Sequence, residues 1–356
     1  MATLTQLARP EIAALRAYIP AAAQPGLVRL NANEAPWRSA ADAANRALNL
    51  YPPARPDKLR NLLAGQYDVV PAELMVTRGT SEAIDLLIRA FCRPAQDDIV
   101  ICPPTFGMYQ VYADIQAAGI QRIALQGAAL ALPVDDIVAA WTPTTKLVFV
   151  TTPNNPTGHS LDVGDIELLA NALDGSGVIV IDAAYIEFGA PESVMALRKY
   201  PHVVILRTLS KAYGLAGARC GSLIADPELI GLIEKVMPPY AVPTPTVEAA
   251  TAALVNEAFA VMPQRIASLC AERRRVASAL RGLPGVRRVW PSDANFLLVT
   301  FDDPQRALAQ ASAAGYLLRD FSEQPETTGC IRITIGSTAD NDALLSALGN
   351  DPETQR

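Results

Sequence analysis

The segment VIVIDAAYIEF (178–188) places four consecutive β-branched residues before Asp182, with Tyr185 three positions later. An apolar run without alternating polar residues is typical of a parallel strand that is buried on both faces. A carboxylate at the end of such a strand is costly unless it meets a cation or hydrogen-bond donors. The segment therefore predicts a buried strand whose end carries a functional carboxylate, with a helix cap or a structural hydrogen bond as the alternative role.

Further apolar runs and helical patterns alternate on both sides of this segment. Alternation of this kind favours an α/β fold, in which a mostly parallel open sheet is covered by helices. In such sheets ligands gather at the carboxyl ends of the strands. Strands are predicted at 74–79, 98–102, 146–152, 177–182, 203–208 and 220–225, and helices at 80–92, 106–117 and 162–173.

The pattern changes after a proline-rich joint, MPPYAVPTPT (237–246). A long helical stretch follows, and the remainder alternates shorter strands and helices, which predicts a small α+β domain. The expected organisation is an N-terminal arm (1–38), a large cofactor-binding α/β domain (39–245), a linking long helix (246–282) and a small C-terminal α+β domain (283–356).

Composition narrows the class of protein. The 356 residues carry a net charge of −6 and no block of basic residues, so nucleic acid is not an expected partner. No apolar run approaches the roughly 20 residues that a membrane helix needs. Five scattered cysteines without a CxxC pair favour a reducing cytoplasm, and two histidines exclude a histidine-rich metal site.

Two polar segments stand where predicted strands end. Gly79, Thr80 and Ser81 lie at a strand-to-helix turn, where free amides bind anions and a glycine permits close approach. The segment TTPNNPTG (151–158) places asparagines between prolines at the end of the predicted strand 146–152. An ordinary capped helix and an ordinary turn are the alternative interpretations.

Lys211 lies in RTLSKAYGLAGARCG (207–221), after an apolar run and eight residues before Arg219. A solvated surface lysine is the commonest case. Apolar surroundings and a nearby cation would instead lower its pKa and make it a nucleophile able to form a Schiff base with a carbonyl cofactor. Asp182 would then pair with a ring nitrogen, an arrangement that matches pyridoxal 5'-phosphate (PLP).

Several phrases along the chain are typical of one enzyme class. By them the sequence resembles the fold-type I, PLP-dependent aminotransferases, class II subfamily, and among these the histidinol-phosphate aminotransferase family. The phrases RAFCRP, PPTFGMY and YIEF together carry the more specific part of the resemblance. The matching segments are LNANEAP (30–36), YPPARP (51–56), RGTSEAIDLLIRAFCRP (78–94), CPPTFGMY (102–109), TPNNPTG (152–158), IDAAYIEF (181–188), the Lys211 segment, LLRD (317–320) and CIRITIG (330–336).

The resemblance implies roles in holding the cofactor. Lys211 would bind PLP covalently and move the proton at the substrate Cα, and Asp182 would pair with the pyridinium nitrogen. Asn155 and Tyr185 would hydrogen-bond the phenolic oxygen, and Phe106 would lie on the ring face, where the family often has tyrosine. The phosphate would be held by Gly79, Thr80, Ser81, Thr208, Ser210 and Arg219.

The resemblance also implies a shared site. Tyr51 would reach the cofactor phosphate of the partner subunit, so a homodimer is expected. Arg332 and Arg319 would bind substrate anions, with a surface ion pair as the alternative for each. Tyr18 and Asn33 would lie near the substrate. Ala183 replaces a glutamate that is frequent in the family, with little effect expected on catalysis.

The implied reaction is transamination between glutamate and imidazole-acetol phosphate, giving 2-oxoglutarate and histidinol phosphate in histidine biosynthesis. Aromatic amino-acid aminotransferase and threonine-phosphate decarboxylase share the scaffold and remain alternatives. A non-catalytic regulator is a further alternative, but such proteins carry a DNA-binding extension, and the stretch before LNANE is short and not basic.

Overall fold

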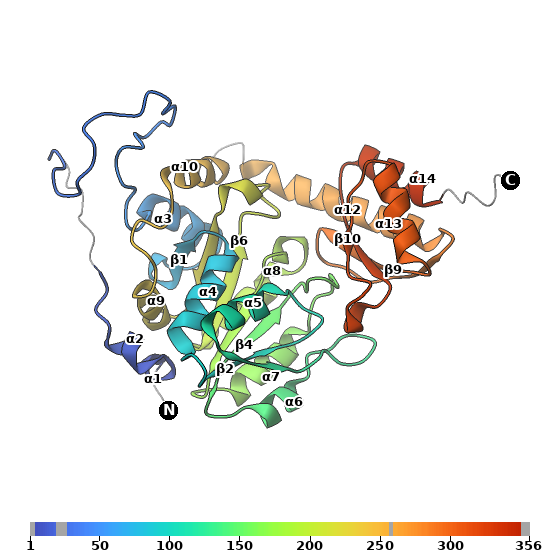
Figure 1. The fold of residues 1–356 in the computed structure, drawn as a ribbon, viewed down its shortest axis with the longest axis horizontal. Coiled ribbons are helices and arrows are strands. Elements are labelled where there is room, and N and C mark those ends of the chain that lie inside the picture. The colour runs from blue at the N-terminus through green and yellow to red at the C-terminus, as the bar shows by residue number, and fades with distance from the viewer. Residues whose placement is uncertain (1–3, 19–26, 256–258, 350–356) are drawn as a thin grey trace.

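The computed structural model describes residues 4–18, 27–255 and 259–349 and forms two β-sheets, each with its own helices. The smaller sheet lies beside the larger one, and a long helix leads from one to the other (Figure 1). This arrangement agrees with the predicted combination of a large α/β part and a small α+β part. The exact boundaries at residues 38, 245 and 282 stay a prediction.

The larger sheet has seven strands in the order β1-β7-β6-β5-β4-β2-β3. The five strands from β6 to β3 are parallel, whereas β7 runs antiparallel to both of its neighbours, β6 and β1. The strands are β1 (Leu74–Thr77), β2 (Asp98–Ile101), β3 (Gly119–Arg122), β4 (Thr145–Thr151), β5 (Val178–Asp182), β6 (Val203–Thr208) and β7 (Gly221–Ile224).

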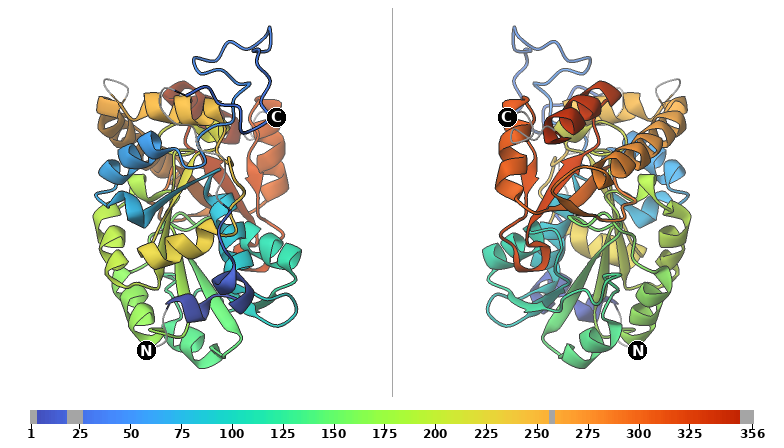
Figure 2. Two further views of the ribbon diagram at one scale, coloured as in Figure 1. Left: turned by 90° about the vertical axis from the view of Figure 1, so that its left-hand side faces the viewer. Right: turned by 90° about the vertical axis from the view of Figure 1, so that its right-hand side faces the viewer.

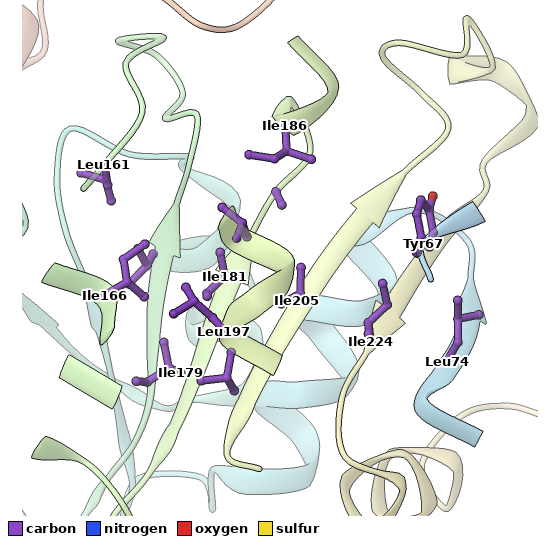
Figure 3. Close-up of a cluster of buried hydrophobic side chains, with 14 of the residues drawn as sticks. Tyr67, Leu74, Leu161, Ile166, Ile179, Ile181, Ile186, Leu197, Ile205 and Ile224 are labelled. Atoms are coloured by element: carbon purple, nitrogen blue, oxygen red, sulfur yellow. The ribbon is translucent and has the colours of Figure 1, made fainter. Parts of the chain in front are cut away.

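Every residue of β5, β6 and β7 is buried, and the apolar runs 178–181 in β5 and 203–206 in β6 predict this for most of those two strands. Alternate residues enter two cores on opposite faces of the sheet. Ile179, Ile181 and Ile205 belong to the core shown in Figure 3, and Val180 and Leu206 belong to the other. The sequence does not predict β3, because this partly exposed edge strand (GIQR) lacks an apolar run.

Helices cover both faces of the larger sheet. One face packs against α4 (Thr80–Phe91), α5 (Met108–Gln116) and α9 (Pro227–Glu234). The other packs against α3 (Asp57–Gln66), α6 (Val134–Ala140), α7 (Val163–Ala172), α8 (Pro191–Met195) and α10 (Thr244–Ala253). The apolar face of α4 confirms the helix predicted from its spacing of apolar residues.

The stretch from 246 to 282 is not the single helix that its composition predicts. Instead, α10 ends at Ala253 and α12 (Met262–Arg281) begins separately. Pro263 lies in the first turn of α12. Proline lacks an N–H and clashes with the preceding turn, so it begins a helix far more readily than it continues one.

The smaller sheet is antiparallel, in the order β10-β11-β9-β8. Its strands are β8 (Val286–Val289), β9 (Phe296–Phe301), β10 (Arg319–Asp320) and β11 (Cys330–Thr334). It packs on α12, α13 (Pro304–Ala313) and α14 (Thr338–Gly349) around a separate core. This mixture of short strands and helices agrees with the small α+β domain predicted from the sequence, whereas the two-residue β10 gives no sequence pattern.

The N-terminal region begins with α1 (Leu4–Leu7) and α2 (Pro10–Ala14), which lie against the larger part. Residues 27–56 then project as a loop (Figures 1 and 2). Leu30 and Trp37 in this loop are 91% and 71% exposed. Within the described ranges, the structure contains no helix long and apolar enough to span a bilayer.

Candidate active site

A cavity of about 160 Å³ lies at the carboxyl ends of β4, β5 and β6. This is the edge of the sheet where an α/β fold is expected to bind its ligand. Segments far apart in the sequence meet here, because parallel strands all end at the same edge. The lining residues are Thr80, Ser81, Phe106, Thr151, Asn155, Asp182, Ala184, Tyr185, Thr208, Ser210, Lys211, Ala216 and Arg219.

Asp182 is the last residue of β5, and its side chain is buried. Tyr109 donates from Oη to Oδ2 at 2.9 Å, and the amide of Ala184 donates to Oδ1 at 3.2 Å. Burial raises the pKa of Asp182 to about 6, and these hydrogen bonds oppose that rise. A buried carboxylate held by neutral donors is suited to a cationic group in the cavity.

Lys211 follows β6 and faces the same cavity. Its Nζ lies 5.3 Å from the ring centre of Tyr185. Although the residue remains exposed at the cavity mouth, desolvation lowers the pKa of its amine, and Arg332 and Arg219 lower it further while Asp182 opposes them. A lowered pKa increases the fraction of neutral amine, which is the nucleophilic and proton-accepting form.

A cluster of donors forms the end of the cavity nearest α4. Thr208 Oγ1 lies 3.0 Å from Ser210 Oγ, and Arg219 Nη1 donates to Ser210 Oγ at 3.4 Å and to the Ala216 carbonyl at 3.0 Å. The N-cap residue of α4, Gly79, has no side chain to cap the first amides of this twelve-residue helix. Hydroxyls, a guanidinium and a helix N-terminus are groups that are suited to binding a phosphate.

Two glycines permit this close packing. Gly79 has a φ of 83°, and a Cβ on it would lie 2.7 Å from Nη2 of Arg219. A Cβ on Gly221 would lie 2.7 Å from the carbonyl carbon of Gly79 and 2.9 Å from the amide nitrogen of Thr80. Both positions therefore require glycine if Arg219 and the start of α4 are to keep their places.

The three residues predicted to contact the cofactor ring come from different segments of the chain. Phe106 and Asn155 come from the loops after β2 and β4, and Tyr185 follows β5. Burial raises the pKa of Tyr185 to about 12, so its hydroxyl remains a proton donor at neutral pH. Its ring packs edge-on against Phe296 of β9, with centroids 5.1 Å apart, so the small sheet contributes to the surroundings of the site.

Arg332 connects the small sheet to the cavity. It lies on β11 and donates from Nη1 to Oδ1 of Asn155. Its guanidinium lies 5.2 Å from the ring centre of Phe296. Arg319 on β10 is the cross-strand partner of Arg332, and it is exposed. The two predicted anion-binding arginines are thus adjacent, with Arg332 directly against the cavity wall.

Gly79, Arg319 and Arg332 are not among the lining residues, and three more predicted residues lie elsewhere in the single chain. Tyr51 is 49% exposed and stacks on Tyr240, with centroids 4.7 Å apart. Tyr18 lines a separate hollow of about 560 Å³ that Tyr240 also lines. Asn33 is exposed in the projecting loop. Their proposed contacts with cofactor or substrate remain predictions, and that of Tyr51 involves a partner subunit.

The structure adds residues that the sequence interpretation missed. Tyr109 is fully buried and shares its hydroxyl between Asp182 and Oγ1 of Thr151, the latter at 2.7 Å. Thr151 is the last residue of β4 and lines the cavity. A signal for both was present: Tyr109 stands one helical turn after Phe106, and Thr151 ends an apolar strand as Asp182 does.

A family model described as aminotransferase class I and II matches residues 26–348. The chain belongs to this aminotransferase family. It is 42% identical to the histidinol-phosphate aminotransferase of Xylella fastidiosa over 97% of this chain and 96% of the relative. It is 43% identical to the histidinol-phosphate aminotransferase of Stenotrophomonas maltophilia over 96% of this chain and 95% of the relative.

Solved structures share the fold. A histidinol-phosphate aminotransferase from Clostridium acetobutylicum matches with a TM-score of 0.77 at 21% identity, over 85% of this chain and 90% of that one. One from Sinorhizobium meliloti, in complex with PLP, matches with a TM-score of 0.76 at 23% identity, over 85% and 83%. These matches confirm the fold-type I architecture expected from the sequence.

Aminotransferases of class I and II use PLP, and the residues of the cavity fit this cofactor. Lys211 offers a primary amine of lowered pKa on the same cavity as the buried carboxylate of Asp182. The two groups that donate hydrogen bonds to Asp182, the Tyr109 hydroxyl and the Ala184 amide, are neutral, which leaves its negative charge available to a protonated ring nitrogen. The donor cluster around Arg219 suits the phosphate group.

Proposed function

We propose that this protein catalyses transamination between glutamate and imidazole-acetol phosphate, giving 2-oxoglutarate and histidinol phosphate, in histidine biosynthesis. The observation that carries the proposal is the identity of 40–43% over nearly the whole chain to relatives named histidinol-phosphate aminotransferase. The cavity supports it, because a lysine, a buried carboxylate and an anion site surround one space.

PLP, when bound, accepts the amino group of one substrate, passes it to the other and stabilises negative charge at the carbon that exchanges its proton. Lys211 holds the cofactor and moves that proton, a role that its lowered pKa favours. Asp182 keeps the ring nitrogen protonated. A cation beside this carboxylate opposes the effect of burial and favours its ionised form.

The remaining cavity residues bind and orient the cofactor in this proposal. Asn155 and Tyr185 hydrogen-bond the phenolic oxygen, and Phe106 packs on the ring face. The phosphate is held at the other end of the cavity. Its ligands are the amides that begin α4 after Gly79, at Thr80 and Ser81, together with Thr208, Ser210 and Arg219.

Both proposed substrates are anions, which explains the placement of arginines near the site in a chain of net charge −6. Arg332 binds the glutamate carboxylate and the phosphate of the second substrate in turn, because a guanidinium fork accommodates either group. Arg319, Tyr18 and Asn33 complete the substrate pocket in this proposal.

The site is complete only in a homodimer in this proposal, with Tyr51 reaching the cofactor phosphate of the partner subunit. Two observations support it: Tyr51 is half exposed and outside the cavity of its own chain, and the projecting loop presents Leu30 and Trp37 to solvent. Apolar side chains gathered in an exposed segment are typical of a subunit interface. A cytoplasmic location stays a prediction from the cysteine pattern.

Substrate choice is tested by supplying histidinol phosphate, phenylalanine and threonine phosphate separately to the purified protein, with 2-oxoglutarate. Formation of glutamate with the highest kcat/KM on histidinol phosphate is the expected result. A preference for phenylalanine would identify an aromatic amino-acid aminotransferase. Release of carbon dioxide from threonine phosphate would identify a decarboxylase.

The attachment of the cofactor is tested in the Lys211→Ala variant. This variant loses the visible absorption of the bound cofactor, and borohydride reduction no longer labels its peptides with PLP. Lys58→Ala, which changes an exposed lysine on α3, keeps both properties. Labelling of another lysine in the wild-type protein would show that the nucleophile is not Lys211.

A further inference from the structure

Arg207 and Glu187 form a buried ion pair just outside the cavity. Arg207 donates from Nη2 to Oε1 of Glu187 at 2.9 Å, and the two side chains are only 5% and 6% exposed. Neither residue lines the cavity of the candidate active site. Any effect of the pair on the chemistry therefore passes through the residues that follow or precede it in the chain.

The position of the pair in the chain links two parts of the site. Arg207 immediately precedes Thr208 and stands four residues before Lys211. Glu187 lies in the short helix η2 (Ile186–Phe188), two residues after Tyr185. The pair therefore joins the segment that carries the lysine to the segment that carries the tyrosine.

The backbone alone does not hold these two segments together. The ladder between β5 and β6 ends with Asp182 opposite Leu206, and the amide of Ala183 makes one more bond to the carbonyl of Leu206 at 3.0 Å. Beyond this point β5 has ended, and the last two residues of β6 pair only with β7. The Arg207–Glu187 contact is the next link between them, and it ties the segments where the sheet no longer does.

A third residue fixes the direction of the arginine. The guanidinium carbon of Arg207 lies 4.4 Å from the ring centre of Tyr67, which follows α3. A planar guanidinium stacked on an aromatic ring has little rotational freedom. Tyr67 is itself 5% exposed, so the arginine is enclosed between a fixed ring and a fixed carboxylate.

Burying this ion pair costs free energy, because the polar atoms lose their contacts with water. Nε of Arg207, Oε2 of Glu187 and Oη of Tyr67 are buried without a hydrogen-bond partner. Burial raises the pKa of Glu187, which shows the cost of keeping its charge. Buried ion pairs of this kind are often replaced by apolar residues with no loss of stability. An apolar pair would not reproduce the fixed orientation that the ion pair gives to the two segments it joins.

We propose that the Glu187–Arg207 ion pair, held against Tyr67, positions Lys211 relative to Tyr185 and so sets the geometry of the cofactor site. Both are positioning residues, since neither touches the cavity. The inference rests on the proposed PLP-dependent function. A wild-type protein that bound no PLP would overturn that function, whereas the variants below test the ion pair alone.

The decisive variant is the double substitution Glu187→Leu/Arg207→Met, which removes both charges and keeps apolar volume. Its melting temperature should equal or exceed that of the wild type. Its Kd for PLP, measured by titrating the apoprotein, should rise, and kcat/KM should fall about 100-fold, the scale of a reacting group displaced by about 1 Å. The pH midpoint of the visible absorption of bound cofactor should also move.

Two further variants complete the test. Glu187→Gln keeps the shape and loses the charge, so it should weaken PLP binding and also lower the melting temperature, because Arg207 is left buried and unpaired. Glu167→Gln is the matched control: it removes one carboxylate from the exposed pair with Lys199 and should leave all four measurements unchanged.

A stable double variant with wild-type Kd, kcat/KM and pH midpoint would overturn the proposal and leave the pair a purely structural feature. If the double variant does not fold, Glu187→Gln decides the matter, since unchanged PLP affinity in that variant has the same consequence.

Discussion

Tyr109 Oη donates a hydrogen bond of 2.9 Å to Oδ2 of Asp182 at the end of β5. The bond opposes the effect of burial on the carboxylate, because it favours the ionised form. Tyr109 is fully buried, and its ring stacks on Phe149 with centroids 4.7 Å apart. Asp182, the proposed partner of the cofactor ring nitrogen, is thus held in place by Tyr109, which does not line the cavity.

Replacing Tyr109 by phenylalanine should remove this bond and keep the packing. The pKa of Asp182 should rise above its value of about 6, which weakens the interaction with a protonated ring nitrogen. We expect kcat/KM to fall about 10-fold, the scale of one hydrogen bond to a charged group. Steady-state rates between pH 5.5 and 8 would show the loss concentrated at the acidic end. A pH-independent loss would contradict this explanation.

The raised pKa of Asp182 predicts a dependence of stability on pH in the apoprotein. The folded state binds the proton more tightly than the unfolded state, with pKa values of about 6 and 3.8. The contribution of this group is therefore most favourable below pH 3.8 and is lost as the pH rises to about 6, by about 3 kcal/mol.

Urea unfolding of the wild type and of Asp182→Asn over this pH range measures the effect. The free energy of unfolding of the variant should increase relative to the wild type as the pH rises. A constant difference would show that the carboxyl group keeps its ordinary pKa in the fold.

Gly79→Ala should weaken cofactor binding through Arg219. The added Cβ would lie 2.7 Å from Nη2 of that arginine, and the φ of 83° is strained for alanine. We expect a loss of about 1–3 kcal/mol in the free energy of unfolding and a higher Kd for PLP. Gly231→Ala in α9 is the control, since no atom lies within 4 Å of its added Cβ. Equal PLP affinity in the two variants would contradict the close packing of Gly79 and Arg219.

Arg332→Lys tests whether substrate binding needs only the positive charge at this position or also the planar guanidinium. The variant keeps a cation but loses the fork, and kcat/KM for both glutamate and histidinol phosphate should fall about 10- to 100-fold, mainly through KM. Arg288→Lys, on strand β8 of the same sheet and stacked on Trp290 at 3.6 Å, should leave these values unchanged. A loss for one substrate only would show that the two anions do not share Arg332.

Mixing two inactive variants tests the shared site. Subunits carrying Lys211→Ala and subunits carrying Tyr51→Ala are combined, exchanged and assayed. If Tyr51 acts on the partner subunit, one site in each mixed dimer is intact, which restores about a quarter of the wild-type sites after random exchange. If Tyr51 acts within its own chain, every site stays damaged and the mixture is no more active than its parents.

Much of the sheet could be predicted because most of its strands contain a continuous apolar run. The signal is strong in β5 and β6, where every residue is buried, and absent in β3, whose polar sequence suits an exposed edge. The break between α10 and α12 could have been inferred from Pro263, but the surrounding alanine, glutamate and arginine residues hide it. Composition alone does not reveal where a helix is interrupted.

The candidate site was predictable where function coincides with the end of a strand. Asp182 and Lys211 both follow apolar runs, and the structure brings them to one cavity. Tyr109 and the Glu187–Arg207 pair were not found, because nothing in a linear sequence shows which buried polar groups face one another. The predicted role of Tyr51 cannot be seen in one chain, since its proposed contact is made with a second chain.

The reversed direction of β7 has a consequence for the loop that carries Lys211. Thr208 and Gly221 are directly opposite each other in the β6–β7 ladder, and Leu209 and Cys220 are joined by a hydrogen bond of 3.1 Å. The loop leaves and re-enters the sheet at one point, so its two ends are fixed to each other independently of what lies between. Protein engineers could therefore exchange residues 210–219 as a single cassette, redesigning cofactor chemistry while the register of the scaffold stays the same.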